Sequence, residues 1–378
     1  MGLHSFQLMN TNRSADRLIM DRTNKILIDL RAKPKTGIHR YASCLLNQQD
    51  FYSAPYQDSF SNYRTPGRIS PLSAIQRFLY ECIFLPFLLK KQKIALFHCT
   101  KNFGLPLFSF GTKRVLTVQD LIPLHLPEYA PNRLIRIYYY WNILLSCAAA
   151  DHILCISQFT ANELTRLFPF VRKKLTITYL GVDSEYFAQS PTDEKDLPPG
   201  LKRKYILTIG GTEPRKNTKI VMDLFLQHPF EGYQLVVIGS EWNGRQFTPT
   251  EKSSPWILRP GKVTEKQLLA LYQHASLFIF PSVYEGFGLP PLEAMACGVP
   301  VAAAKASCLP EILGDAAEWF EPHSQDSLIS AVHQILHNHD HRNNLIQKGY
   351  RKAKTYTWEK TVRETLNVYH ILLKNPSG

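Results

Sequence analysis

The feature that most constrains this chain is a repeated alternation of short apolar runs with longer amphipathic segments. In the first half the apolar runs are KILIDL (25–30), IALFHC (94–99), RVLTVQD (114–120), HILCIS (152–157) and LTITYLG (175–181). Stretches with helical periodicity lie between them, at 38–46, 133–149 and 158–168. Such alternation predicts a parallel sheet whose strands are joined by crossover helices.

A change of composition interrupts this pattern once. Residues 189–204, QSPTDEKDLPPGLKRK, are rich in proline and charge and are expected to be a linker. The alternation then resumes, with strands expected at 205–210, 234–239, 276–280 and 299–304 and helices from about 217, at 264–274 and at 290–297. An amphipathic helix is expected at 357–374.

The length of 378 residues suits two domains. We therefore expect an α/β protein with a polar extension (1–24), one domain at 25–188, the linker at 189–204 and a second domain at 205–356. The last segment, 357–378, carries the final helix.

The distribution of charge and of cysteines restricts the possible partners and the cellular compartment. Of the net charge of +13, residues 1–185 carry +11, from 23 Lys and Arg against 12 Asp and Glu. This excess favours an anionic partner for the first half, either nucleic acid or a phospholipid surface, although a solvated basic face is the alternative. The seven cysteines form no CxxC pair and no zinc-ligand spacing, which predicts a reduced, cytoplasmic protein.

The most apolar run, FLYECIFLPFLL (78–89), is too short to span a membrane and contains Glu81 and Pro86. It is followed by KKQK. Two interpretations remain open: a core helix, or an interfacial helix at a membrane surface.

Residues 281–298, PSVYEGFGLPPLEAMACG, predict a glycine-broken loop between a strand and a helix that starts at Pro290. Glu285 then lies in the loop and Glu293 in the first helical turn. Glu293 could simply favour the helix dipole, and Gly286 and Gly288 could only provide turn geometry. A carboxylate inside an anion-attracting loop nevertheless suggests a hydroxyl-rich ligand.

A second loop, within ILTIGGTEPRKN (206–217), joins Gly210 and Gly211 to the basic pair Arg215 and Lys216. A basic pair after a strand and before a helix is well placed for a diphosphate. In an open parallel sheet this loop and the 281–291 loop lie at the same edge, so we expect them to converge on one ligand. A site for phosphate and polyol together describes a nucleotide sugar.

These motifs together resemble those of a known family. The chain resembles the retaining glycosyltransferases of the GT4 family, most closely at 280–312, where Glu285 and Glu293 match the family's E-x7-E signature. Further similar segments are TGIHRY (36–41), TVQDLIPL (117–124), ISQFTANEL (156–164), YLGVD (179–183), GGTEPRKN (210–217) and TWEKTVRETLNVY (357–369). The resemblance implies the GT-B fold, in which two Rossmann-like domains face each other and a C-terminal helix crosses back.

The resemblance also implies roles for individual residues. Glu285, Arg215 and Lys216 are expected to be catalytic, the carboxylate ordering the sugar and the cations neutralising the departing diphosphate. Glu293 is expected to accept hydrogen bonds from the ribose. The expected donor-binding residues are Gly37, Gly211, Arg215, Lys216, Glu285, Gly286, Phe287, Gly288, Leu289 and Glu293.

On the acceptor side the resemblance implies Gln119 and Asp120. Many relatives have His where this chain has Gln119. An amide can form hydrogen bonds but cannot take up or release a proton, so no acid–base role is expected at this position. His98 is a further acceptor-side candidate, expected at a strand end in the cleft, with a core histidine as the alternative. No Asp-x-Asp motif is present, so no metal or other cofactor is expected.

The expected function is metal-independent, retaining transfer of a hexose from a nucleotide sugar, GDP-mannose or a UDP-sugar. The expected acceptor is a glycan or lipid-linked precursor of a cell-surface polysaccharide or lipopolysaccharide. We expect an anionic membrane surface as a partner, no nucleic acid, and a place in the cytoplasm or on the inner face of its membrane. The alternatives are a nucleic-acid-binding protein and a catalytically inactive sugar-binding homologue.

Overall fold

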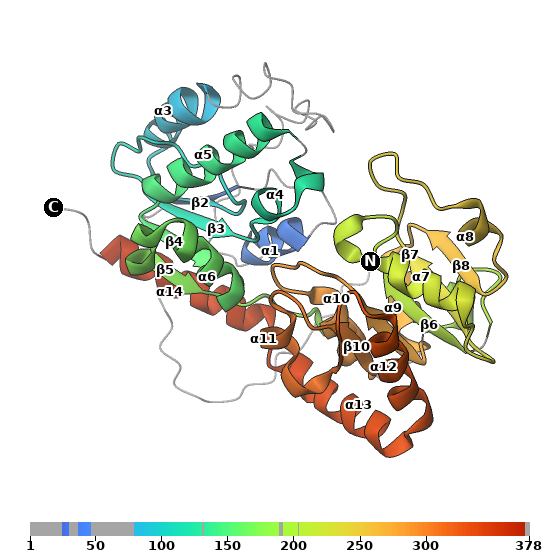
Figure 1. Ribbon diagram of the computed structural model, residues 1–378. Helices are drawn as coiled ribbons and strands as arrows, with labels where there is room; N and C mark the ends of the chain where they lie inside the picture. Colours follow the sequence, from blue (N-terminus) through green and yellow to red (C-terminus); the bar gives the residue numbers. More distant parts are fainter. Residues whose placement is uncertain are drawn as a thin grey trace, which may run out of the picture.

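The computed structural model describes residues 25–29, 37–46, 79–130, 132–188, 192–202 and 204–374. Two α/β domains lie next to each other, each built on a parallel sheet flanked by helices (Figure 1). The expected extension at 1–24 lies outside the described residues, as do 189–191 and 203 of the expected linker and 375–378 at the end.

The first sheet has the strand order β1-β2-β3-β4-β5, and every neighbouring pair is parallel. Its strands are β1 (Lys25–Ile28), β2 (Ile94–Cys99), β3 (Lys113–Val118), β4 (His152–Cys155) and β5 (Leu175–Ile177). The accompanying helices are α1 (Gly37–Leu46), η1 (Tyr80–Phe84), α3 (Leu85–Lys91), α4 (Ile122–His125), η2 (Pro127–Tyr129), α5 (Arg133–Ala149), α6 (Gln158–Leu167), η3 (Pro169–Lys174) and η4 (Ser184–Phe187). The expected helix at 133–149 and the expected strand at 94–99 are confirmed to the residue.

The second sheet has the order β11-β10-β9-β6-β7-β8 and is also parallel throughout. Its strands are β6 (Tyr205–Ile209), β7 (Gln234–Ile238), β8 (Ile257–Gly261), β9 (Leu277–Phe280), β10 (Val301–Ala304) and β11 (Glu318–Phe320). Because the chain runs outward from β6 to β8 and then restarts at β9, the order reverses between β6 and β9. Ligands in such sheets bind at the carboxyl ends of the strands beside this reversal.

The helices and short turns around the second sheet are η5 (Glu194–Asp196), η6 (Pro214–Lys216), α7 (Thr218–Gln227), α8 (Pro249–Ser253), α9 (Glu265–Gln273), α10 (Leu289–Ala296), α11 (Leu309–Leu313), η7 (Gly314–Ala316), α12 (Gln325–His337) and α13 (His339–Lys354). Several begin at side chains that cap free backbone N–H groups. In α9 the Thr264 hydroxyl accepts from Gln267, whose side chain accepts from the Thr264 N–H in return. Such caps explain why these helices begin where they do.

The last helix, α14 (Trp358–Lys374), returns to the N-terminal domain and packs against α1 and β2 (Figure 1). It crosses the chain at Gly181, where a Cβ atom would lie 2.2 Å from the Trp358 backbone nitrogen. A residue with a side chain would therefore push α14 away from its starting point. The crossover helix expected from the sequence is thus present.

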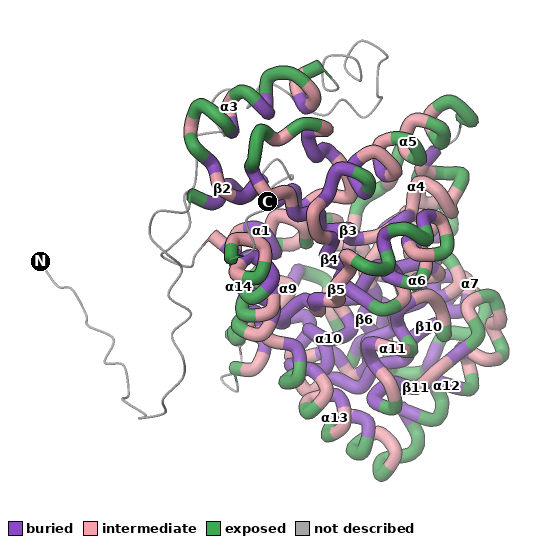
Figure 2. Tube along the Cα trace, turned by 90° about the vertical axis from the view of Figure 1, so that its left-hand side faces the viewer, coloured by how far each residue is buried: buried purple, intermediate pink, exposed green. Residues whose placement is uncertain are grey.

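Segment 79–91 has one buried face and one exposed apolar face. Leu85 and Leu89 are buried in the core, whereas Phe84 and Phe87 are 65% and 60% exposed. Figure 2 shows α3 with an exposed outer side at one end of the N-terminal domain, while the strands beneath are buried. The segment therefore packs into the core on one face and exposes apolar side chains on the other.

One expectation about helix α10 is wrong. The helix begins at Leu289, capped by Gly288 at a φ of +96°, one residue before the predicted start. Its first turn contains no acidic residue, so Glu293 lies one turn further along. The carboxylate therefore does not act as a first-turn partner of the helix dipole, and its role depends on what it contacts.

Candidate active site

Two loops meet beside the strand-order reversal, one following β6 and the other following β9. Arg215 Nη1 lies 2.6 Å from Glu285 Oε2, and Lys216 Nζ lies 2.7 Å from Glu285 Oε1. The Arg215 guanidinium also donates to the Tyr284 carbonyl oxygen at 3.0 Å, so the two loops are bonded through backbone as well. The convergence predicted from the sequence is confirmed, and the three expected catalytic side chains form one cluster.

Glu285 is a buried but ionised carboxylate. Burial alone favours the neutral acid, but Lys216 and Arg215 outweigh it and lower the pKa of Glu285 to about 2. The Ser282 hydroxyl adds a hydrogen bond of 2.6 Å to Oε1, and the Glu285 N–H donates to the Ser307 hydroxyl at 3.0 Å. The charge and the orientation of this carboxylate are therefore both fixed by its surroundings.

Three glycines let the backbone make these loops. Gly211 has a φ of +57°, and a Cβ there would lie 2.2 Å from the Ser240 carbonyl oxygen. At Gly286 a Cβ would lie 2.0 Å from the Gln119 carbonyl oxygen of the other domain. Gly211 thus lets its loop pass close to Ser240, Gly286 lets its loop contact the N-terminal domain, and Gly288 forms the start of α10.

Glu293 contacts the other domain directly. Arg40, in α1, places Nη1 2.7 Å from Glu293 Oε1, and the Tyr272 hydroxyl donates to Oε2 at 3.2 Å. Burial raises the pKa of Glu293, against the opposing charge of Arg40. Arg40 is not among the site residues expected from the sequence, although it lies inside the TGIHRY segment.

The acceptor-side pair Gln119 and Asp120 follows β3 and faces the Gly286 loop through its backbone. Asn102 holds this turn: its Oδ1 accepts from the Gln119 N–H at 2.7 Å, and its Nδ2 donates to Asp120 Oδ1 at 3.4 Å. The Gln119 side chain is buried and donates to the Thr100 carbonyl oxygen at 3.3 Å. Burial raises the pKa of Asp120, with the charge of Arg215 opposing that shift.

His98 does not lie in the cleft. It is fully buried, with Nε2 2.7 Å from the Thr117 hydroxyl and Nδ1 bonded to the Tyr369 hydroxyl of α14. Burial lowers the pKa of His98 to about 3, so the ring is neutral. The geometry is that of a core histidine, and it gives no support to an acceptor-side role.

The remaining expected donor-binding residues are spread around the cluster. Phe287 is buried and packs edge-on to Tyr356 at 5.4 Å. Leu289 is the first residue of α10 and is partly buried. Gly37 is the first residue of α1, and a Cβ there would meet no atom within 4 Å, so no described contact requires glycine at that position.

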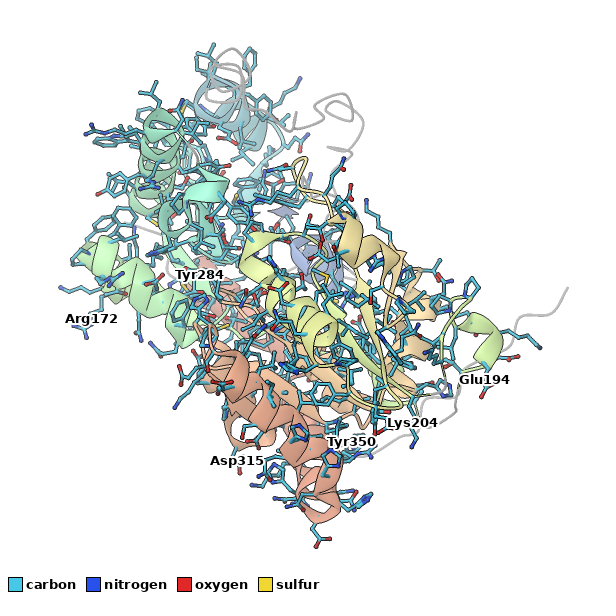
Figure 3. The ribbon with its side chains drawn as sticks, turned by 45° about the vertical axis from the view of Figure 1, so that its right-hand side comes forward. Arg172, Glu194, Lys204, Tyr284, Asp315 and Tyr350 are labelled. Carbon is cyan, nitrogen blue, oxygen red and sulfur yellow. The ribbon has the colours of Figure 1, made fainter. Side chains whose placement is uncertain are left out.

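Further contacts between the domains surround the cluster. Glu213 bonds Arg215 at 2.9 Å and accepts a hydrogen bond from the Tyr129 hydroxyl, while the Tyr129 ring packs on Trp242 with centroids 5.0 Å apart. The Tyr284 hydroxyl donates to Glu163 at 2.9 Å, and Figure 3 shows Tyr284 where the two domains meet. These contacts were not expected from the sequence, because they depend on how the domains face each other.

A glutamate side chain of the C-terminal domain, Glu311, caps a helix of the N-terminal domain. Glu311 accepts from the backbone N–H groups of Gln158 and Phe159, at 2.7 and 2.8 Å, where α6 begins. A carboxylate at a helix N-terminus satisfies free donors and interacts favourably with the dipole.

A cavity of about 570 Å³ lies away from the cleft, lined by residues that include Phe230, His333 and His337. No Lys or Arg of the described residues lines this cavity, so we place the active site at the cluster of Arg215, Lys216 and Glu285. Across the described ranges, no group of three or more His, Cys, Asp or Glu residues is arranged to hold a metal ion. Within the same part of the chain no helix has the length and apolar character needed to cross a membrane.

Two facing domains with parallel sheets, a returning C-terminal helix and a charged cluster at the strand-order reversal define a GT-B glycosyltransferase. The family described as "Glycosyl transferases group 1" matches residues 189–352, and "Glycosyltransferase Family 4" matches residues 49–186. The chain belongs to glycosyltransferase family 4 and is a hexosyltransferase of that type.

Individual relatives agree with this assignment. The O-antigen chain mannosyltransferase B of Escherichia coli is 31% identical over 375 residues, covering 90% of this chain and 97% of the relative. A sucrose-phosphate synthase from Thermosynechococcus elongatus has a TM-score of 0.68 at 18% identity, covering 93% of this chain and 99% of that one. Anabaena HepE, solved with UDP and glucose, has a TM-score of 0.68 at 13% identity, covering 92% and 99%.

Proposed function

We propose that this enzyme is a retaining mannosyltransferase that elongates a bacterial surface polysaccharide of the O-antigen type, with GDP-mannose as the first donor to test and UDP-hexoses as the alternative. The observation that carries the proposal is Glu285, which bridges Arg215 and Lys216 at 2.6 and 2.7 Å beside the strand-order reversal. The similarity to an O-antigen mannosyltransferase over nearly its whole length supports mannose as the sugar.

In this proposal the cluster stabilises the leaving group. As the glycosidic bond breaks, negative charge grows on the diphosphate, and Arg215 and Lys216 stabilise it from positions that Glu285 has already fixed. The Glu285 carboxylate and the N–H groups of residues 286–288 orient the sugar hydroxyls. The acceptor attacks from the face that the diphosphate leaves, and the leaving phosphate takes the acceptor's proton.

We further propose that no metal ion takes part. The two cations supply the positive charge that a bridging divalent ion provides in other transferases. Replacing both Arg215 and Lys216 with Ala should then abolish transfer and weaken binding of the nucleoside diphosphate, whereas EDTA should leave the wild type active. Strict dependence on added magnesium or manganese contradicts this part of the proposal.

For the acceptor we propose a lipid-linked glycan reached from the cytoplasmic face of a membrane. The exposed Phe84 and Phe87 of segment 79–91 lie near Lys90 and Lys91, and Lys90 Nζ stands 4.9 Å from the Phe110 ring centroid. An apolar face beside cations is suited to binding anionic lipid. We assign the excess positive charge to this surface and not to nucleic acid.

A donor panel tests the function. Purified enzyme is incubated with GDP-mannose, GDP-glucose, UDP-glucose and UDP-galactose, with and without a mannose-containing acceptor, and release of nucleoside diphosphate is measured. We expect GDP-mannose to react fastest and NMR to show an α-linked mannosyl product, the configuration of the donor. Inverted configuration contradicts retention, and binding without turnover for every donor supports the inactive-homologue alternative.

A further inference from the structure

Arg40 joins three parts of the molecule that are far apart in the sequence. Its guanidinium projects from α1 of the N-terminal domain, and Nη1 lies 2.7 Å from Glu293 and 3.4 Å from Asp183. Asp183 in turn accepts from the Trp358 indole at 2.5 Å, at the start of α14. Among the described residues, Arg40 is the only cation ion-paired with Glu293.

The Glu293 carboxylate keeps free acceptor capacity despite its two partners. A carboxylate offers about four lone-pair sites on its two oxygens. Arg40 occupies one site on Oε1, and Tyr272 occupies one site on Oε2. One site therefore remains on each oxygen, which matches the two adjacent hydroxyls of a ribose.

We propose that Arg40 is a positioning residue for the donor's ribose, holding Glu293 ionised and in one orientation so that it accepts both ribose hydroxyls. The inference rests on the proposed function, in which Glu293 binds the ribose of a nucleotide sugar. It adds that ribose recognition by the C-terminal domain requires a side chain from the N-terminal domain.

The electrostatic surroundings of Glu293 explain why a cation is needed. Glu293 is 4% exposed as a residue, and its burial favours the neutral acid. The other charged or titratable groups that interact with it are Asp183, Tyr186, Tyr272 and Cys297, which come from several elements and are anionic when ionised. Arg40 is therefore the charge that opposes protonation, helped by the hydrogen bond from Tyr272. A protonated Glu293 has fewer lone pairs for the ribose.

A purely structural link between the domains predicts something different. Loss of such a link would lower the melting temperature and turnover without changing which nucleotide binds. Loss of a positioning residue instead changes discrimination at the ribose and makes donor binding depend on pH. These readouts separate the two roles.

The test measures binding of GDP, 2′-deoxy-GDP, UDP and 2′-deoxy-UDP by calorimetry between pH 6 and 8. For the nucleotide base that binds, wild type should prefer the ribose form about tenfold, as expected for a lost hydrogen bond to a charged group. In Arg40→Gln this preference should fall to about twofold at pH 8 and disappear towards pH 6, while the KM for the donor rises more than kcat falls. Arg40→Lys retains the charge and should restore most of the preference.

The control is Arg172→Gln, which makes the same change at an exposed position of the N-terminal domain and should behave as wild type. Melting temperatures of all variants show whether each is folded. If Arg40→Gln does not fold, the ribose preference of Arg40→Lys is compared with that of the wild type across the same pH range. Unchanged ribose preference in folded Arg40→Gln, or a pH-dependent Arg40→Lys that has lost its preference, overturns the role of Arg40. If wild type itself ignores the 2′-hydroxyl, the ribose-binding role of Glu293 fails, and the role of Arg40 fails with it.

Discussion

Glu285 and Glu293 are both buried glutamates, yet their surroundings act on them in opposite directions. Glu285 lies between two cations, and its pKa falls to about 2. Glu293 has one cation, and burial raises its pKa above the ordinary value. Two carboxylates with separated pKa values in one site usually have different tasks.

We expect substitutions of the two residues to differ in kind. Glu285→Gln removes the charge that fixes Arg215 and Lys216, so kcat should fall about 100-fold or more. Glu293→Ala should mainly raise the donor KM, by a loss of about 1–3 kcal/mol of binding. Steady-state kinetics with a varied nucleotide sugar measure both effects.

Glu285→Gln also takes the carboxylate away from Lys216 and leaves Arg215 paired with Glu213 alone. Breaking a buried ion pair in this way is itself destabilising, by about 3–5 kcal/mol. Melting temperatures must therefore accompany the kinetics, with Glu321→Gln as a control at an exposed position. A folded Glu285→Gln enzyme with unchanged kcat would remove Glu285 from the catalytic residues.

At the scale of elements, local pattern predicted the structure best where a strand or helix is long and regular. The helix α5 and the strand β2 agree with their predicted bounds, and the loops after β6 and β9 converge as expected. The strands β8 and β11 were not predicted, because β8 contains Pro260 and Gly261 and β11 has only three residues. Helix α12, capped by Ser324, carries a periodic apolar pattern that the sequence analysis did not use.

The site was predictable only within each domain. The loop motifs identified Glu285, Glu293, Arg215 and Lys216 because each motif is contiguous in the sequence. Contacts such as Arg40 with Glu293, 253 positions apart, depend on the relative placement of two domains, which local periodicity does not specify.

Segment 79–91 gives a prediction at the same scale. Each Lys near an anionic surface contributes about 1 kcal/mol, so changing Lys90, Lys91 and Lys93 together to Ser should lower vesicle binding about 100-fold. Replacing the exposed Phe84 and Phe87 with Ser should also weaken binding, although the charge is kept. Cosedimentation with phosphatidylglycerol vesicles at low and high salt measures both effects.

The charge-matched control changes Lys348, Lys352 and Lys354 of α13 to Ser and should bind vesicles as the wild type does. Donor binding should be unaffected in every variant. Wild type that ignores anionic vesicles at low salt would make segment 79–91 a core element alone and would favour a soluble acceptor.

At the scale of the whole molecule, α14 packs against the N-terminal domain. His98 of β2 lies at the junction between α14 and that domain. Its ring bonds Thr117 of β3 on one side and Tyr369 of α14 on the other. A protonated ring would donate from both nitrogens and would place a charge in a fully buried position. The junction therefore requires the neutral form.

This requirement predicts a loss of stability in acid. The unfolded chain takes up a proton on His98 below the ordinary pKa of 6.5, whereas the folded protein does so only near pH 3. Between these values the unfolded state binds more protons than the folded state. The free energy of unfolding therefore decreases as the pH is lowered, by up to about 1.4 kcal/mol per pH unit. Urea unfolding at pH 7, 6 and 5 measures this slope.

His98→Gln should be less stable than wild type at pH 7 but should lose less stability between pH 7 and 5. His323→Gln, at an exposed position, serves as the control and should keep the wild-type slope. An equal slope in wild type and His98→Gln would show that acid unfolding starts elsewhere.

The packing of Trp242 on Tyr129 provides a fluorescence signal for separation of the two domains. The two rings belong to different domains, and their centroids are 5.0 Å apart. Separation of the domains would hydrate the indole and shift its emission to longer wavelength, while a ligand that holds the domains together would keep the emission blue. In a variant that keeps only Trp242 of the five tryptophans in the chain, the wavelength of maximum emission would report domain opening in real time without an added dye.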